Sequence, residues 1–403
     1  MKQIVIIGGG FAGIRFLENI CKRTDVAITL IDQNPYHYLQ PEVYGYVANS
    51  LQFSDVIIDL YTLCASFGSN VSFCQKEVTG IDTDRRQVIA SDRVIDYDYL
   101  VIATGSRTLF PDSVKGLGDV FAGGIKSIPN ALVFKQHFER NMIKLIESEG
   151  SCQVGQHFDI VVGGAGLSGV ETAAEMACYA KDLYRHFGYL CEGVRVTLAC
   201  SGDHVLPGTD EVITDYATKR LESLGVNIRY NTRISEVAPD SVTYCNGHKQ
   251  QMDFLVWTGG IIGSELIRKL DLPKTDKHFI QTDDFYRLPD CPEVFAIGDA
   301  AMLKNPITGT PKPPTSQMAE RTGEYVARII CQLIDGHTPK KEPLKMQGLF
   351  VALGGHCGVG VIQKRFHLKG YPAHLFKQAI FKAYKWPLLI RCRRGYKRIA
   401  KGS

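Results

Sequence analysis

Two glycine-rich turns, each placed between an apolar strand and a helix, most constrain what this chain can fold into. Both have the spacing GxGxxG: "GGGFAG" follows "KQIVII", and "GAGLSG" follows "FDIVVG". The first turn comprises Gly8, Gly10 and Gly13, and the second comprises Gly164, Gly166 and Gly169. In each unit a second apolar strand follows the helix, which is the βαβ pattern of a parallel sheet covered by helices. The sequence therefore predicts an α/β fold with two Rossmann-like dinucleotide-binding domains.

The first unit has the chemistry of a complete dinucleotide site. Its glycines allow a tight turn and the close approach of a pyrophosphate, whose charge the helix N-terminus stabilises. Asp32 ends the next strand, where an acid accepts a ribose hydroxyl. In the second unit Cys200 stands at the corresponding strand end, and no Lys or Arg follows closely to hold a 2′-phosphate. The choice between NADH and NADPH therefore stays open.

Charge is distributed very unevenly along the 403 residues. From Lys345 onward there are 13 Lys and Arg and no Asp or Glu, whereas the preceding part has 33 basic and 42 acidic residues. A basic tail on an acidic body argues against a nucleic-acid binder and favours a local anionic partner such as lipid headgroups. The twelve cysteines include no CxxC pair, so neither a metal site nor a disulfide framework is expected.

The N-terminus lacks the separate apolar region and cleavage site of a signal peptide, and no run of 18 apolar residues would span a bilayer. We expect domain bounds at residues 1–120 with 291–345 for the first nucleotide, 121–290 for the second, and 346–403 for a C-terminal membrane-associating region. The segment "GLFVALGGHCGVGVI" in the last region is typical of a hairpin.

Three further segments end in glycine after an apolar run: "YLVIATGS", "FLVWTGGI" and "EVFAIGDAA". With the two dinucleotide turns, in this order, they resemble the flavoproteins related to glutathione reductase, and within that group the type II NADH:quinone oxidoreductases. The resemblance covers nearly the whole chain, and it implies FAD in the first fold and NADH or NADPH as substrate in the second. It also implies a peripheral enzyme on the cytoplasmic face of the cell membrane, and it allows a homodimer. The residues that it adds to the FAD site are Ala103, Thr104, Gly105, Gly298 and Asp299.

The resemblance implies that the flavin's electrons pass to a membrane quinone, because "YHYLQPEVY" contains no cysteine where disulfide reductases have a thiol pair. The family's quinone site corresponds to Glu171 in "GLSGVET" and Gln317 in "TSQMAER". The second match is partial, since Ser316 and Arg321 replace an Ala and a Gln of the family pattern. Glu171 is expected in the first turn of its helix, and Asp299 at a helix N-terminus beside the flavin.

Two alternatives remain open at this point. A sulfide:quinone oxidoreductase has the same scaffold but needs two thiols beside the flavin, for which Cys357, Cys152 and Cys178 are candidates. A membrane flavin sensor without turnover is the second alternative, which only Cys200 favours.

The tail predicts an amphipathic helix from Ala373 to Lys385. Its apolar face comprises Phe376, Ile380, Ala383 and Tyr384, with Trp386 at the level of the lipid headgroups. Pro387 is expected to end or kink the helix. Docking of the same helix on the protein itself or on a second subunit is the alternative to a membrane contact.

Overall fold

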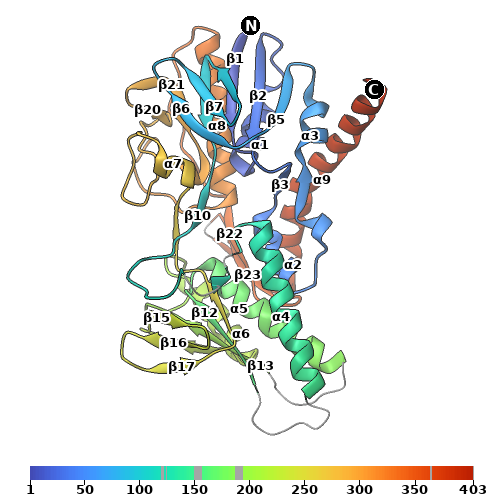
Figure 1. The fold of residues 1–403 in the computed structure, drawn as a ribbon, viewed down its shortest axis with the longest axis vertical. Helices are drawn as coiled ribbons and strands as arrows, with labels where there is room; N and C mark the ends of the chain where they lie inside the picture. Colours follow the sequence, from blue (N-terminus) through green and yellow to red (C-terminus); the bar gives the residue numbers. More distant parts are fainter. Residues whose placement is uncertain (119–121, 124, 149–156, 187–193, 364, 403) are drawn as a thin grey trace.

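The computed structural model describes residues 1–118, 122–123, 125–148, 157–186, 194–363 and 365–402. Two lobes are stacked along the long axis of the molecule, and each is built on a largely parallel sheet (Figure 1). The last helix runs along one side of the upper lobe (Figure 1). This arrangement confirms the predicted fold class of two Rossmann-like units.

The upper sheet has the strand order β20-β21-β9-β1-β2-β5. Its parallel part consists of β21 (Cys291–Ala296), β9 (Tyr99–Ile102), β1 (Lys2–Ile7), β2 (Val26–Asp32) and β5 (Val71–Gln75). The edge strand β20 (Arg287–Leu288) is antiparallel to β21. The order reverses at β1, and the carboxyl end of such a strand is where doubly wound sheets bind ligands. Helices α1 (Phe11–Ile20) and α8 (Ser316–Ile334) pack against each other in this lobe.

The lower sheet repeats this design in the order β11-β18-β12-β13-β14, with all neighbours parallel. Its strands are β11 (Ala122–Gly123), β18 (Phe254–Trp257), β12 (Phe158–Gly163), β13 (Val194–Ala199) and β14 (Asn227–Arg229). Helix α5 (Leu167–His186) follows β12. Each lobe also contains a three-stranded antiparallel sheet, β6-β7-β8 in the upper and β15-β16-β17 in the lower. The domain bounds given above remain a prediction.

The C-terminal region contains a three-stranded antiparallel sheet and one long helix. The strands are β22 (Gly348–Ala352), β23 (Gly358–Ile362) and β24 (Phe366–Gly370), of which the first two form the predicted hairpin. Helix α9 (Tyr371–Gly402) packs along α3 (Leu60–Phe67), so closely that a Cβ on Gly395 would lie 1.7 Å from the Thr62 carbonyl oxygen. Within the described part of the chain, no helix combines the length and apolar composition needed to cross a membrane.

Two expectations about the tail helix are corrected. Of the two effects expected of Pro387, the end of the helix is wrong, because α9 continues through it to Gly402, and a kink there stays a prediction. An internal proline costs about 3 kcal/mol because it removes a hydrogen bond and crowds the preceding turn. Contacts on both sides offset this cost: Lys385 forms an ion pair with Asp55 at 2.9 Å, and Leu388 is buried. The second correction concerns Tyr384, whose hydroxyl points into the protein and not toward lipid.

The remaining elements complete the chain. They are β3 (Tyr36–Tyr38), η1 (Gln40–Glu42), α2 (Val43–Val47), η2 (Phe53–Asp55), β4 (Ile57–Asp59), β6 (Val78–Asp82), β7 (Gln87–Ala90), β8 (Arg93–Asp96), β10 (Ser106–Thr108), α4 (Ile128–Ser148), α6 (Glu211–Ser223), β15 (Ile234–Ala238), β16 (Ser241–Tyr244), β17 (Lys249–Gln251), β19 (Ile261–Gly263), α7 (Glu265–Lys269) and η3 (Gly298–Ala300).

Candidate active site

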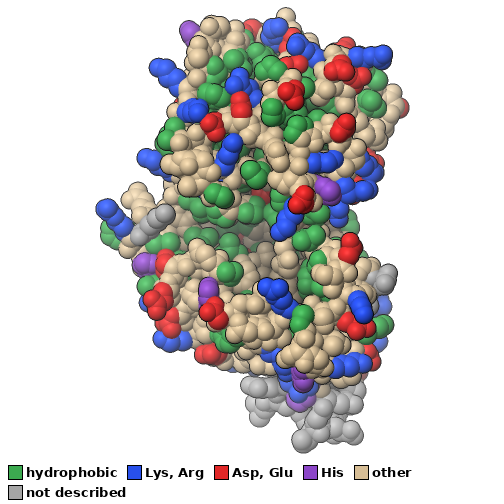
Figure 2. All heavy atoms as spheres, turned by 90° about the vertical axis from the view of Figure 1, so that its left-hand side faces the viewer, with side chains coloured by type: hydrophobic (Ala, Val, Ile, Leu, Met, Phe, Trp, Pro, Cys, Tyr) green, Lys and Arg blue, Asp and Glu red, His purple; other side chains and the backbone are tan. Residues whose placement is uncertain are grey.

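A cavity of about 1070 Å³ runs between the two lobes and reaches the C-terminal helix. Space-filling shows a hollow between the lobes that is bordered by hydrophobic side chains (Figure 2). The cavity brings together eleven of the predicted site residues: Gly8, Gly10, Asp32, Ala103, Thr104, Gly105, Gly166, Glu171, Gly298, Asp299 and Gln317. The other three, Gly13, Gly164 and Gly169, lie outside its lining and shape the turns.

The first glycine turn has the shape that a pyrophosphate needs. A Cβ on Gly8, whose φ is +109°, would lie 2.4 Å from the Ala103 carbonyl oxygen, and one on Gly13 would lie 2.0 Å from the Gly8 carbonyl oxygen. A Cβ on Gly10 would meet nothing within 4 Å, although this residue lines the cavity. The outer two glycines thus permit the tight turn, and the middle one leaves open space at the N-terminus of α1.

Asp32, at the end of β2, is held firmly beside this turn. One carboxylate oxygen accepts the Gly9 N–H at 2.7 Å, and the other accepts the Asn34 N–H at 2.8 Å. Burial raises the pKa of this carboxyl, and the hydrogen bonds from Asn34 and Gly9 oppose that rise. The residues present therefore fit the adenosine and pyrophosphate parts of FAD.

Asp299 also lines the cavity. It lies in the first turn of the short 3-10 helix η3, and not at the N-terminus of an α-helix, since the next α-helix begins only at Ser316. Its carboxylate accepts the Ser106 hydroxyl at 3.0 Å, and Ser106 in turn accepts a hydrogen bond from Lys126 at 2.8 Å. Burial lowers the pKa of Lys126, and Asp299 opposes this shift. Sequence reasoning missed Lys126, which lies outside the glycine motifs.

The second glycine turn repeats the first. A Cβ on Gly169 would lie 1.8 Å from the Gly164 carbonyl oxygen, and Gly166 again faces open space. Thr258, after β18, donates its hydroxyl to the Gly163 carbonyl at 3.0 Å and lines the cavity. Cys200 is buried and its thiol contacts the His204 carbonyl at 3.1 Å, so it replaces the expected acid without facing a nucleotide.

Glu171 forms the centre of a polar cluster at the junction of α5, β22 and α9. It is buried, it accepts the Ala352 N–H at 2.9 Å, and the same oxygen accepts a hydrogen bond from Lys377. It lies in the second turn of α5 and not in the first, which removes the simple explanation of an acid at a helix N-terminus. Sequence reasoning missed the pairing of Glu171 with Lys377, because 206 positions separate the two residues.

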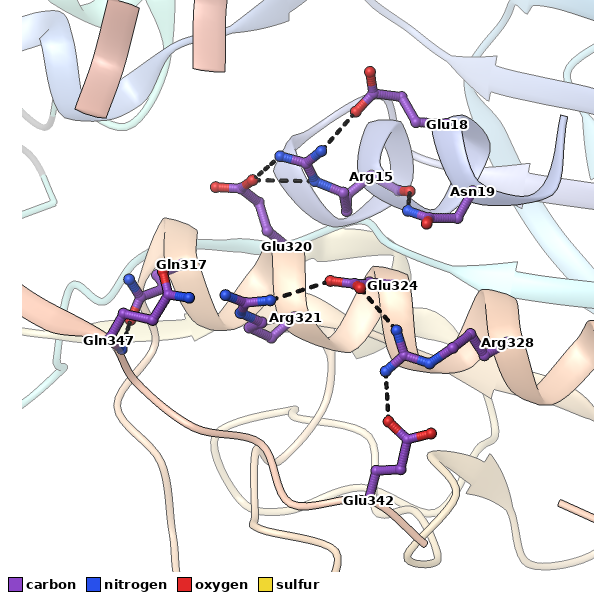
Figure 3. Close-up of polar contacts among 10 residues, drawn as sticks. All are labelled: Arg15, Glu18, Asn19, Gln317, Glu320, Arg321, Glu324, Arg328, Glu342 and Gln347. Atoms are coloured by element: carbon purple, nitrogen blue, oxygen red, sulfur yellow. Dashed lines mark hydrogen bonds and ion pairs between the residues drawn. The ribbon is translucent and has the colours of Figure 1, made fainter. Parts of the chain in front are cut away.

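Gln317 lies in the first turn of α8, which begins at Ser316. The Thr315 hydroxyl caps this helix by accepting the Met318 N–H at 3.2 Å. The Gln317 side-chain oxygen accepts the Gln347 N–H at 2.9 Å, which joins α8 to the segment directly before β22 (Figure 3). The residue is half-buried at the cavity wall and not free in solvent.

Glu175, one helical turn beyond Glu171, is a second acid close to Lys377. Burial raises its pKa to about 7, and Lys377 opposes this shift. The folded state therefore prefers the protonated acid, whereas the unfolded chain ionises near pH 4.5. The free-energy cost that the Glu175 carboxylate imposes on the folded state is absent below pH 4.5 and grows as the pH rises toward 7.

We expect Glu175→Gln to stabilise the protein at pH 8 by about 1 to 3 kcal/mol, and to leave its stability unchanged at pH 4.5. Thermal unfolding at the two pH values tests this, with the exposed Glu222→Gln as the matched control. A gain of equal size at both pH values would contradict it.

The described cysteines lie away from the cavity. None of them lines it, and Cys152, one of the three candidate thiols, lies outside the described residues. Cys357 contacts the Tyr216 hydroxyl on α6 at 3.7 Å, and Cys178 packs against the backbone at Gly354. The described thiols thus provide no relay beside the FAD cradle.

Comparison with known proteins agrees with this geometry. Curated type II NADH:quinone oxidoreductases from Staphylococcus haemolyticus and Staphylococcus aureus are each 28% identical, over 387 and 369 residues that cover 94% and 90% of both chains. The NDH2 structure from Plasmodium falciparum in complex with NADH has a TM-score of 0.82 at 19% identity, and covers 99% of this chain and 98% of that one. The sulfide:quinone oxidoreductase of Aquifex aeolicus has a TM-score of 0.80 at 21% identity, with 97% and 92% covered.

These two structures share the fold of this chain, and the curated relatives confirm the resemblance inferred from its motifs. The pyridine nucleotide-disulphide oxidoreductase family matches residues 2–323, which span both glycine turns and Asp299. The chain belongs to the pyridine nucleotide-disulphide oxidoreductase family.

Proposed function

We propose that this protein is an FAD-dependent peripheral membrane enzyme that transfers two electrons from NADH to a membrane quinone. The observation that supports this most is the single cavity, which joins the FAD-shaped glycine cradle to a polar cluster beneath the C-terminal helix. The names of the curated relatives favour NADH and quinone as the two substrates.

In this proposal the first glycine turn, Asp32 and the Ala103–Gly105 loop would hold FAD, and the Asp299 carboxylate would accept a hydrogen bond from a ribityl hydroxyl. The chemistry that bound FAD supplies is hydride acceptance from NADH, followed by two-electron reduction of the quinone. The second glycine turn and Thr258 hold the nicotinamide nucleotide against the cavity. The chain itself orients the two substrates and excludes water between the lobes.

The quinone end of the cavity is the part nearest α9. Leu349 and Phe350 of β22 and Ile380 and Phe381 of α9 line it with apolar surface, beside Glu171 and Lys377. Quinone reduction consumes two protons, and an acid paired with a cation is suited to deliver protons and to stabilise negative charge on the quinone oxygens.

Gln317→Ala should slow quinone reduction by about three- to tenfold while flavin reduction by NADH stays close to the wild-type rate. The substitution removes an amide from the cavity wall and leaves the Gln347 N–H without its acceptor. Separate stopped-flow measurement of the two half-reactions tests this. Gln250→Ala, whose side chain bonds Tyr244 away from the cavity, is the control for losing a side-chain hydrogen bond. An equal loss in both half-reactions would remove Gln317 from the quinone site.

The exposed face of α9 supports membrane association. Leu375, Phe376, Ile380, Trp386 and Ile390 are all exposed apolar side chains of this helix. Basic residues follow them on the same helix, and each adds about 1 kcal/mol of attraction near an anionic lipid surface. We propose that the protein is peripheral and lies on the cytoplasmic face of the cell membrane. We also propose the domain bounds given above. A homodimer is compatible with this position.

One anaerobic titration tests the function as a whole. NADH should bleach the flavin absorbance, and a quinone should then restore it. Sulfide added alone should leave the flavin oxidised, and bleaching by sulfide instead of NADH would favour a sulfide:quinone oxidoreductase. No bleaching by any reductant would favour a flavin sensor without turnover.

A further inference from the structure

His37 is a fully buried histidine in β3 to which the proposed reaction gives no role. Its Nδ1 lies 2.9 Å from the Gly9 carbonyl oxygen, in the glycine turn that cradles FAD. Its Nε2 lies 3.0 Å from the hydroxyl oxygen of Tyr384 on α9. One imidazole ring thus bridges the cofactor turn and the C-terminal helix. His37 and Tyr384 themselves lie 347 positions apart in the sequence.

The partners of His37 determine its tautomer. A carbonyl oxygen only accepts, so Nδ1 must carry the hydrogen and donate it to Gly9. Nε2 of the neutral ring then only accepts, and the Tyr384 hydroxyl must donate to it. The hydrogen bonds form a directed chain from Tyr384 through His37 to Gly9, and burial, which lowers the pKa of His37 to about 4, keeps the ring neutral.

Gly9 is held from both sides. Its N–H donates to Asp32 at 2.7 Å, and its carbonyl accepts from His37. Because Gly8 and Gly10 flank it directly, fixing both polar groups of Gly9 fixes the orientation of the peptide groups that would face a pyrophosphate.

The surroundings hold Tyr384 in place. Phe11, at the start of α1, has its ring centroid 4.9 Å from those of both His37 and Tyr384. The Arg15 guanidinium lies over the Tyr384 ring, 5.7 Å from its centroid. Arg15 also binds Glu18 and Glu320, which ties α1 to α8 (Figure 3). Arg391 on α9 forms an ion pair with Glu18 at 3.6 Å. The described contacts thus place four charged groups around the Tyr384 end of the bridge: Arg15, Glu18, Glu320 and Arg391.

We infer that His37 and Tyr384 are positioning residues for FAD, so that the seating of α9 on the protein and the affinity for FAD are linked. The inference rests on the proposed use of FAD, and it extends that proposal to the role of the C-terminal helix. Linkage is reciprocal: bound FAD should also hold α9 more firmly on the protein.

Tyr384→Phe tests the link by removing a single oxygen atom. Losing the donor leaves the buried Nε2 unsatisfied, and we expect FAD to bind about tenfold more weakly. The measurement is titration of the FAD-free protein with FAD, followed by flavin fluorescence. Tyr396→Phe, an exposed tyrosine on the same helix, is the matched control and should bind FAD as the wild type does.

A purely structural role of the hydroxyl predicts a different pattern. In that case the melting temperature of the FAD-free protein would fall as much as that of the loaded protein, and FAD affinity would be unchanged. We expect the loaded protein to lose more. The variants His37→Phe, Tyr384→Phe and their combination form a cycle in which the second substitution should add little to the first.

Hydrogen exchange of the wild-type protein gives a second readout that needs no variant. FAD should slow amide exchange in α9 around Tyr384, and should leave exchange unchanged in α6, none of whose residues lines the cavity. Unchanged FAD affinity in Tyr384→Phe, or FAD-independent exchange in α9, would overturn the inference. Failure of NADH to reduce a quinone would overturn the proposed function alone, because the link concerns FAD binding and not turnover.

Discussion

Glu171→Gln should slow reduction of the quinone about 100-fold and leave reduction of the flavin by NADH nearly unchanged. The amide still accepts the Ala352 N–H, but it can neither take up and pass on a proton nor balance the charge of Lys377. Removal of a general acid typically costs a factor of 10² or more. Stopped-flow absorbance of the flavin resolves the two half-reactions, first with NADH and then with quinone after removal of excess NADH.

Two further variants sharpen this experiment. Glu324→Gln breaks ion pairs with Arg321 and Arg328 on α8, away from the cavity lining, and should leave both half-reactions unchanged (Figure 3). Lys377→Met should reproduce the selective loss, because Glu171 and Lys377 act as a pair. Equal slowing of both half-reactions by Glu171→Gln would assign Glu171 to flavin binding instead.

Replacing the exposed apolar side chains Leu375, Trp386 and Ile390 together with Asp should release the protein from anionic vesicles. Each substitution removes the free energy gained when one apolar side chain is buried in lipid, about 1.5 to 3 kcal/mol. It also adds a carboxylate that the anionic lipid repels. Partition into vesicles should fall by more than 100-fold, as measured by co-sedimentation. Turnover with long-chain quinone in vesicles should fall with it, while turnover with a water-soluble quinone should fall much less.

Three exposed apolar residues on other surfaces provide the control. Val94, Val133 and Ile143, replaced with Asp, carry the same chemical change on β8 and α4. This triple variant should bind vesicles as the wild type does. Equal release by both variants would show that net charge, and not the α9 face, governs membrane binding. Truncation of the tail is a less direct test, since α9 also packs on α3 and contacts His37.

The parts of the fold that were predicted correctly are those that depend on residues close together in the sequence. The glycine turns depend on spacing within six residues, and the structure places their outer glycines where any side chain would collide with backbone. The hairpin of β22 and β23 likewise depends on neighbouring residues. The parts that sequence missed depend on contacts between distant segments.

Lys377 and Tyr384 illustrate that limit. A helical pattern assigns Lys377 to a polar face and Tyr384 to an apolar one, yet the cation is largely buried against Glu171 and the hydroxyl bonds a buried histidine. Pro387 is a similar case, because only the ion pair and the buried leucine on either side of it show why the helix continues.

Ile380 lines the cavity and is 45% exposed, and it lies on α9 with the exposed apolar residues Leu375, Trp386 and Ile390. The same turn of helix is therefore both a wall of the candidate quinone site and part of the face that we propose binds lipid. A quinone that enters there would not need to pass through bulk water. The rate should then follow the mole fraction of quinone within the lipid and not its total concentration, so that adding empty bilayer at constant quinone would dilute the substrate in two dimensions and slow the enzyme.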